Sequence, residues 1–177
     1  RHMLSVEAVM RHYAQSMCED PGRWGLAGLI HDFDWEIHPT LEDHPAKGAP
    51  ILREHSLDED LIKTILSHNT EFTGVERQRP IDFALLACDE ITGLIVACVL
   101  VRPSKNIRDL SLKSVKKKWK DKAFAAGVDR SHVDTATADF SAACFDGKLD
   151  LWQHVETVVA TMQGAAAILE LDGRLAS

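Results

Sequence analysis

A histidine and an aspartate, His31 and Asp32, directly follow an apolar run that extends from Leu26 to Ile30. Side by side, an imidazole and a carboxylate offer one nitrogen and one oxygen donor to a divalent cation. Such mixed donors suit Mn, Fe, Zn or Co better than a thiolate-only or all-oxygen site would. A single His-Asp pair is weak evidence by itself, so the metal hypothesis depends on further ligands elsewhere in the chain.

Further histidines and one aspartate occur within other segments whose apolar residues repeat with helical spacing. His2 lies on the first of these patterns, and His44 opens the third. His68 ends the fourth pattern, and Asp89 lies inside the fifth among apolar neighbours. An unpaired carboxylate in apolar surroundings is costly, so Asp89 needs a metal, an arginine or a hydrogen-bond network. The donors therefore follow the order His, His-Asp, His, His, Asp.

This order resembles the HD-domain superfamily of metal-dependent phosphohydrolases, in the form with six metal ligands. The local contexts are similar as well, since His2 precedes the segment SVEA as the family's first histidine precedes its helix. The segments that carry the resemblance are residues 44–52 (HPAKGAPIL), similar to H-x-x-x-G-A-x-I-L; residues 65–69 (ILSHN), similar to I-x-x-H-H; and residues 86–91 (LACDEI), which hold the closing aspartate. Together these motifs span residues 2–89.

Two later segments, residues 91–97 (ITGLIVA) and 102–105 (RPSK), resemble a bacterial HDIG-like subgroup. With the helical patterns, the resemblance implies an all-α, single-domain HD-type bundle over residues 1–177. Its metal-site core would cover about residues 2–102, and a C-terminal helical extension would cover about residues 103–177.

The resemblance also implies which side chains bind metal, and His31 with Asp32 would form the catalytic centre. Six donors suit two octahedral ions that share Asp32 as a bridging carboxylate. The six are His2, His31, Asp32 and Asp89 around one ion, with His44 and His68 completing the other. A one-metal site is the alternative, in which His44 and His68 would contact substrate or donate protons. The cofactor would be one or two divalent ions, with Mn, Fe, Zn, Co, Ni and Mg as candidates.

A water between two such cations would become hydroxide near neutral pH and attack phosphorus in line. The chain has no G-x-S-x-G motif and no P-loop, so no protein nucleophile is indicated. The resemblance therefore implies a phosphomonoesterase or phosphodiesterase for a small anionic phosphorylated substrate, a nucleotide being one candidate. Two rivals remain, a di-iron oxygenase of the HD fold and a non-catalytic metal-binding regulatory protein.

Six lysines fall within residues 113–122 of an otherwise acidic chain. They form either a solvated helix face or a positive rim that attracts an anionic substrate. On the second interpretation, the candidate phosphate contacts are Lys47, Arg102, Lys105, Lys113 and Lys116.

The net charge of −7 argues against binding to nucleic-acid polymers or anionic membranes. No apolar run is expected to be long enough to span a membrane, the longest being at about residues 94–101. Four scattered cysteines without a C-x-x-C motif, and no visible signal peptide, indicate a reducing compartment, so we expect a cytoplasmic location.

The first helix lacks an N-cap, which indicates either missing upstream residues or a cloning remnant. The oligomeric state is left open.

Apolar spacing predicts a first helix over residues 2–18 and a final helix over residues 149–171. The most hydrophobic segment starts at Pro80 and should be the central, buried helix.

Asp34 is interpreted mainly as a solvated loop acid, with orientation of a ligand histidine as the alternative. His38, His55 and His132 are predicted at the surface, and His154 is predicted on the polar side of the final helix.

Overall fold

A computed structural model describes residues 1–175, and within them it contains nine α-helices, one short 3₁₀ helix and no strand. The prediction of an all-α fold is confirmed. In chain order the elements are α1 (His2–Ser16), α2 (Pro21–Ile30), α3 (Ala49–Glu54), α4 (Glu59–Ser67), α5 (Thr70–Thr73), α6 (Pro80–Leu100), η1 (Ile107–Asp109), α7 (Leu112–Lys120), α8 (Arg130–Cys144) and α9 (Leu151–Gly164).

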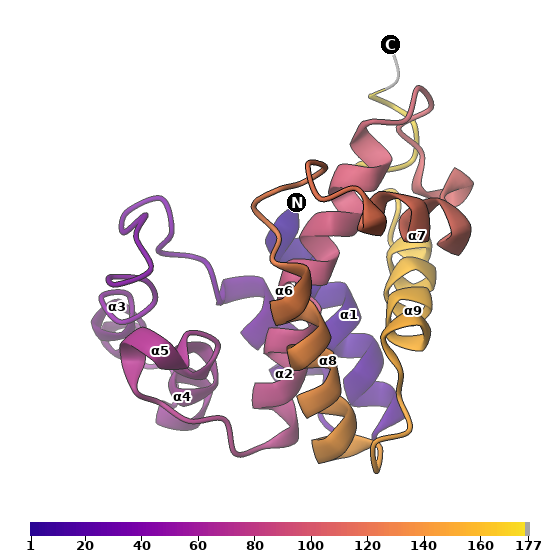
Figure 1. Ribbon diagram of the computed structural model, residues 1–177. Coiled ribbons are helices and arrows are strands. Elements are labelled where there is room, and N and C mark those ends of the chain that lie inside the picture. The colour runs from indigo at the N-terminus through magenta and orange to yellow at the C-terminus, as the bar shows by residue number, and fades with distance from the viewer. Residues whose placement is uncertain (176–177) are drawn as a thin grey trace.

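The long helix α6 is the centre of the fold, as its apolar sequence predicts, and α1, α8 and α9 pack around it (Figure 1). Contrary to the prediction from sequence, it is long and apolar enough to cross a membrane, with a mean hydropathy of 2.1. However, 61% of the 18-residue stretch of α6 with this hydropathy is buried inside the molecule. A helix that is apolar all round and covered by other helices is the core of a globular bundle, so α6 is weak evidence for a membrane span.

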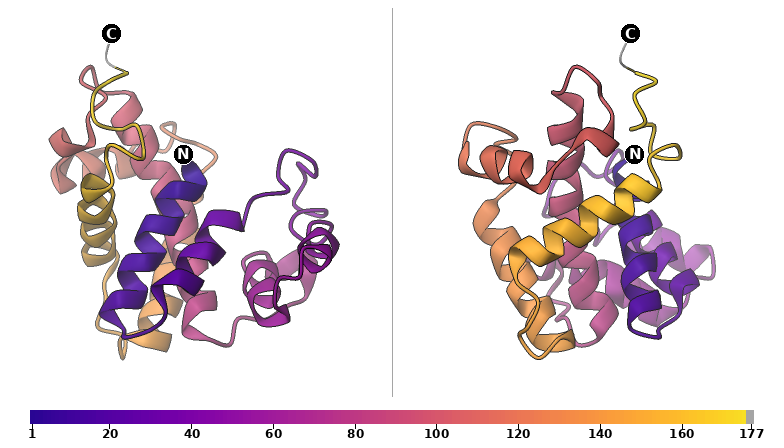
Figure 2. Two further views of the ribbon diagram at one scale, coloured as in Figure 1. Left: turned by 180° about the vertical axis from the view of Figure 1, so that it is seen from behind. Right: turned by 90° about the vertical axis from the view of Figure 1, so that its right-hand side faces the viewer.

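The first two helices run antiparallel and pack tightly against each other (Figure 2). The start of α1 therefore lies beside the end of α2, which brings His2 next to His31 and Asp32. Gly28 permits this close approach, because a Cβ added there would lie 2.9 Å from the backbone nitrogen of Glu7 on α1. Real Cβ atoms essentially never come so close to a backbone atom.

We expect Gly28→Ala to lower the free energy of unfolding by about 1–3 kcal/mol, because α1 must move to admit the methyl group. Gly93→Ala is the matched control, since a Cβ at that position within α6 meets nothing within 4 Å. Alanine favours a helix interior over glycine by roughly 0.5–1 kcal/mol, so the control should be neutral or stabilising. Urea unfolding of both variants measures the difference, and equal destabilisation by the two would contradict the close-approach argument.

Helices α3, α4 and α5 lie to one side of this body (Figure 1), and α3 and α4 share a small hydrophobic cluster of their own. Ile30 and Phe33, at the end of α2, pack against this cluster and so connect the two parts. The prediction that His44 opens the third helix is wrong, because α3 begins at Ala49. A residue before proline is disfavoured in helical conformation, and His44 precedes Pro45. His44 therefore lies in the turns that lead into α3.

Helices α8 and α9 contribute to the same hydrophobic cluster as α1 and α6. The final helix ends at Gly164, earlier than predicted, and glycine is a poor helix former. The prediction that His154 lies on a polar side is wrong, because its side chain is 0% exposed. There Nδ1 accepts a hydrogen bond from the Tyr13 hydroxyl at 2.6 Å, and Nε2 donates to the Ala87 carbonyl at 2.8 Å.

Candidate metal centre

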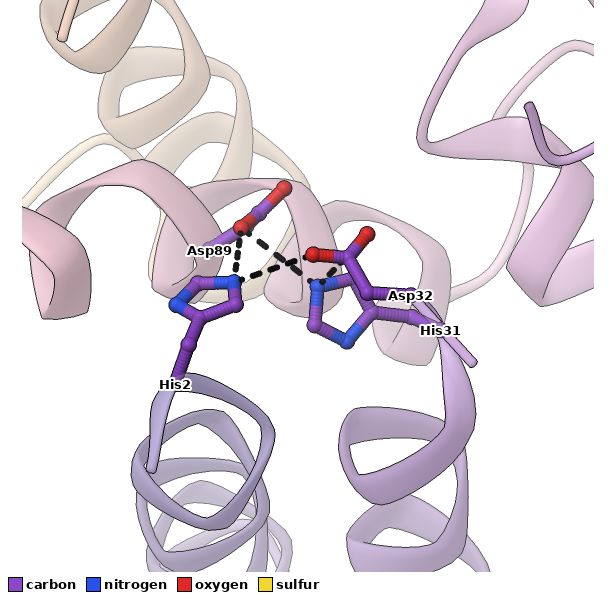
Figure 3. A group of neighbouring side chains, drawn as sticks. All are labelled: His2, His31, Asp32 and Asp89. Carbon is purple, nitrogen blue, oxygen red and sulfur yellow. Dashed lines mark ion pairs between the residues drawn. The ribbon is translucent and has the colours of Figure 1, made fainter. Parts of the chain in front are cut away.

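Four side chains from three helices or helix ends meet at one point (Figure 3). His2 is the first residue of α1, and its Nε2 lies 3.0 Å from Asp89 Oδ1 and 3.4 Å from Asp32 Oδ2. His31 follows α2 directly, and its Nε2 lies 3.4 Å from an oxygen of each aspartate. Asp89 comes from the middle of α6. Two imidazole nitrogens and two carboxylates thus surround a space suited to a cation.

A second group shares Asp32 with the first. Asp32 Oδ1 lies 3.1 Å from His44 Nε2 and 3.9 Å from His68 Nε2. The two histidine nitrogens are themselves 3.0 Å apart. The structure therefore brings all six sequence-predicted ligands together, in two groups with one aspartate in common. Their role as metal ligands stays a prediction.

The hydrogen bonds of three histidines show which ring nitrogen is free. A backbone carbonyl only accepts hydrogen bonds, so His31 Nδ1 must donate to the Gly28 carbonyl at 2.9 Å. His68 Nδ1 donates likewise to the carbonyl of Ile65, and His44 Nδ1 donates to Asp34 Oδ1 at 2.7 Å. In each neutral ring the Nε2 lone pair therefore faces the cluster, which is the form that binds a metal.

None of these three Nε2 atoms has a satisfactory partner in the protein alone. His31 Nε2 is a buried atom without a hydrogen bond among the described residues. The lone pairs of His44 and His68 face each other at 3.0 Å, and they repel unless a proton or a cation lies between them. Helices α2 and α4 also end beside these histidines, and the C-terminal end of a helix favours a nearby cation. The donor set therefore fits a divalent ion.

The pKa values in the cluster indicate competition between protons and a cation. Burial lowers the pKa of His2, but Asp32 and Asp89 outweigh it and raise the pKa to about 10. Burial lowers the pKa of His31, but Asp89 and Asp32 outweigh it and raise the pKa, so this ring is charged when no cation is bound. Burial and that charge lower the pKa of His68 to about 4. The neighbouring histidines hold the pKa of both aspartates well below the usual range despite their burial. A bound cation must displace the protons, so metal affinity should rise with pH.

Asp34 is not the solvated loop acid that the sequence mainly suggested, because its side chain is 0% exposed. It accepts the hydrogen bond from His44 and so fixes the ring, in agreement with the alternative interpretation. Gly48 leaves room for this carboxylate, since a Cβ added there would overlap Asp34 Oδ2. The only sequence signal for this role is the position of Asp34 two residues after Asp32.

We expect Asp34→Asn to weaken metal binding about 10–100-fold, because the residue that orients His44 loses its charge. Asp43→Asn is a matched control in the same loop, where the carboxylate only pairs with Lys47 at the surface, at 2.9 Å. Titration of the metal-free protein in competition with a chelator measures both affinities. Equal affinities for the two variants would remove the orienting role from Asp34.

A cavity of about 340 Å³ opens onto the cluster. The residues that line it are Asp32, Trp35, Leu41, His44, His68, Asn69, Glu71, Phe72, Leu86, Asp89, Glu90 and His132. His132 is exposed, as predicted, but it lies at this cavity and its Nδ1 is 2.8 Å from Glu90 Oε1. Pairing with Glu90 raises the pKa of His132. No spacing pattern signalled this position, which comes 43 residues after Asp89.

None of the five predicted phosphate contacts is among the residues that line this cavity. Lys47 pairs with Asp43, and Lys116 lies over the ring of Trp152, 4.8 Å from its centroid. Arg102 follows the C-terminal end of α6 and lines a different hollow beside α7. Their contact with substrate stays an untested prediction.

A family model described as the HD domain matches residues 1–92. The match covers slightly more than half of the chain and includes all six clustered side chains. No curated protein and no solved structure matches the chain.

Proposed function

Because the chain belongs to the HD domain family, we propose that it is a metal-dependent phosphohydrolase. It cleaves a phosphomonoester or phosphodiester of a small molecule, with a nucleotide among the candidates. The observation that carries this proposal is the pair of donor groups that share Asp32. The finer similarity to the HDIG-like subgroup and the cytoplasmic location remain predictions.

His2, His31, Asp32 and Asp89 would hold one ion, and Asp32, His44 and His68 would hold a second. When bound, such ions act as Lewis acids on a phosphoryl oxygen and make a neighbouring water more acidic. Nitrogen and oxygen donors without a thiolate are compatible with Mn, Fe, Co, Ni or Zn, while Mg prefers oxygen. The ion is therefore identified by measurement, not by the donor set.

The protein's own contribution is to hold the donors rigidly before substrate arrives. Carbonyl groups fix the rings of His31 and His68, and Asp34 fixes the ring of His44. Preorganised groups of this kind need no rearrangement during the reaction. No cysteine is among the residues that line the cavity, and burial raises the pKa of the Cys88 thiol. These features support attack by water over attack by a protein nucleophile.

The test is metal analysis of the purified protein, followed by a phosphatase and phosphodiesterase screen with added Mn, Fe, Co, Ni, Zn or Mg. Metal-dependent hydrolysis of a phosphoester is the expected result. Redox-active iron with a visible absorption band and oxygen consumption, without hydrolysis, would identify the oxygenase alternative. A bound metal without any turnover across a broad panel would favour a regulatory protein.

A further inference from the structure

Apolar side chains that water would normally avoid gather at the cavity beside the metal cluster. Trp35, Leu41 and Phe72 are 41%, 54% and 39% exposed, and all three line this cavity together with the buried Leu86. They come from the loop after α2, from α5 and from α6. Exposed apolar groups gathered in one concave place are typical of a ligand-binding site.

This apolar wall is held in place relative to the metal cluster. The ring of Trp35 stands edge-on to the ring of His44, with 5.0 Å between centroids. The side-chain amide of Asn69 donates to the carbonyls of Leu41 and His44, at 2.8 and 2.6 Å. The loop that carries Leu41 is therefore tied to the end of α4, next to the ligand His68. An organic group against this wall would sit beside the cluster.

The charges of the cavity outside the six clustered residues are unfavourable for extra phosphate groups. Among the residues that line it there is no lysine and no arginine. Glu71 and Glu90 contribute carboxylates, and His132 is already paired with Glu90 at 2.8 Å. One phosphate group can be neutralised by cations at the cluster, but a second or third would have no partner and would face Glu71. Glu71 is exposed, and like charges repel one another even where water screens them, so additional phosphate groups would bind less tightly.

We propose that the substrate is a small phosphate ester with a single phosphate group and an uncharged, apolar or aromatic organic part. Trp35, Leu41 and Phe72 receive the organic part, and Glu71 selects against di- and triphosphates. The cavity volume of about 340 Å³ lies near the lower end for small-molecule sites, which fits a small ester. This inference rests on the proposed hydrolase function.

The kinetic test compares phenyl phosphate with glycerol phosphate, and adenosine monophosphate with the triphosphate, with metal in excess. We expect kcat/KM for phenyl phosphate to exceed that for glycerol phosphate about tenfold or more, and kcat/KM for the monophosphate to exceed that for the triphosphate by a similar factor. One apolar contact or one unpaired charge can supply such a difference. Phe72→Ser should lower kcat/KM for phenyl phosphate about tenfold relative to kcat/KM for glycerol phosphate. Ile168→Ser, at a 70% exposed position that is not part of the cavity lining, is the control.

The charge argument has its own variant, and the apolar wall has a second readout that needs no turnover. Glu71→Lys should raise kcat/KM for the triphosphate relative to the monophosphate at least about fivefold. Calorimetric titration of the metal-loaded protein with benzylphosphonate should give a dissociation constant about tenfold higher in Phe72→Ser than in Ile168→Ser. Equal binding to these two variants would overturn the assignment of the apolar wall.

The outcomes separate this inference from the proposed function. If no phosphoester is hydrolysed by the metal-loaded protein, the hydrolase proposal fails, whatever benzylphosphonate does. If phosphoesters are hydrolysed but glycerol phosphate or the triphosphate is preferred, the hydrolase proposal holds and the proposed substrate class is wrong.

Discussion

Asp32→Ala is expected to abolish metal binding and to lower turnover at least about 1000-fold, equivalent to roughly 4 kcal/mol of transition-state stabilisation. Asp32 is the residue that the two donor groups share, so its loss removes a carboxylate from both. Its oxygens lie between 3.1 and 3.9 Å from nitrogens of four histidines. The four imidazoles would then have to hold any cations with Asp89 as the single remaining carboxylate.

Metal content after purification and after reconstitution measures the first effect, and hydrolysis of the best substrate from the screen measures the second. Asp32→Asn keeps the size of the side chain and should behave like the alanine variant, which separates charge from packing. Glu36→Gln is the control, because Glu36 is an exposed acid in the same loop. An Asp32→Ala protein that is active without metal would refute the role assigned to this residue.

The second large effect concerns His154, which should make the fold less stable in mild acid. Its neutral ring satisfies both partners in the core, because Nδ1 accepts from Tyr13 and Nε2 donates to the Ala87 carbonyl. Protonation would place a charge in the core and remove the acceptor for Tyr13. Burial accordingly lowers the pKa of His154 to about 4, from 6.5 for a free histidine.

The direction in which stability changes with pH follows from which state of the protein, folded or unfolded, binds the proton on His154. Below pH 6.5 the unfolded chain protonates His154 while the folded protein does not, until the pH approaches about 4. The stabilising contribution of neutral His154 is therefore fully present above pH 6.5. As the pH falls, the free energy of unfolding decreases by about 2 kcal/mol at pH 5 and about 3 kcal/mol at pH 4.

Urea unfolding of the metal-free wild-type protein and of His154→Gln, at pH 7 and pH 5, isolates this contribution. At pH 7 the His154→Gln protein should be less stable than the wild type by about 1–3 kcal/mol. The glutamine side chain fills the site of the imidazole imperfectly and forms poorer hydrogen bonds with Tyr13 and the Ala87 carbonyl. The difference between the two proteins should shrink by about 2 kcal/mol at pH 5, since only the wild type has the titrating group. A difference that stays constant with pH would show that His154 is not held neutral in the folded state.

The identities of the clustered side chains could be predicted from the sequence because their signals are local. His31 and Asp32 end an apolar run, and His68 comes where the apolar spacing of its helix stops. Asp89 is an acid in an otherwise apolar helix, which demands a partner wherever that helix packs. The all-α fold and the central place of α6 followed from the same spacing, since a helix that is apolar all round must be covered.

The tertiary structure alone placed His132 at the cavity and His154 in the core, and it decided between the two roles that the sequence left open for Asp34. Asp34 is buried because its loop folds over His44, and His132 reaches the cavity because α8 packs along α6. His154 is buried because α9 lies against both α1 and α6. The sequence indicated which side chains could bind a cation, because their types and their immediate neighbours are properties of short segments. Which polar groups are buried, paired or open to a substrate depends on helices far apart in the chain, and only their packing sets the distances between them.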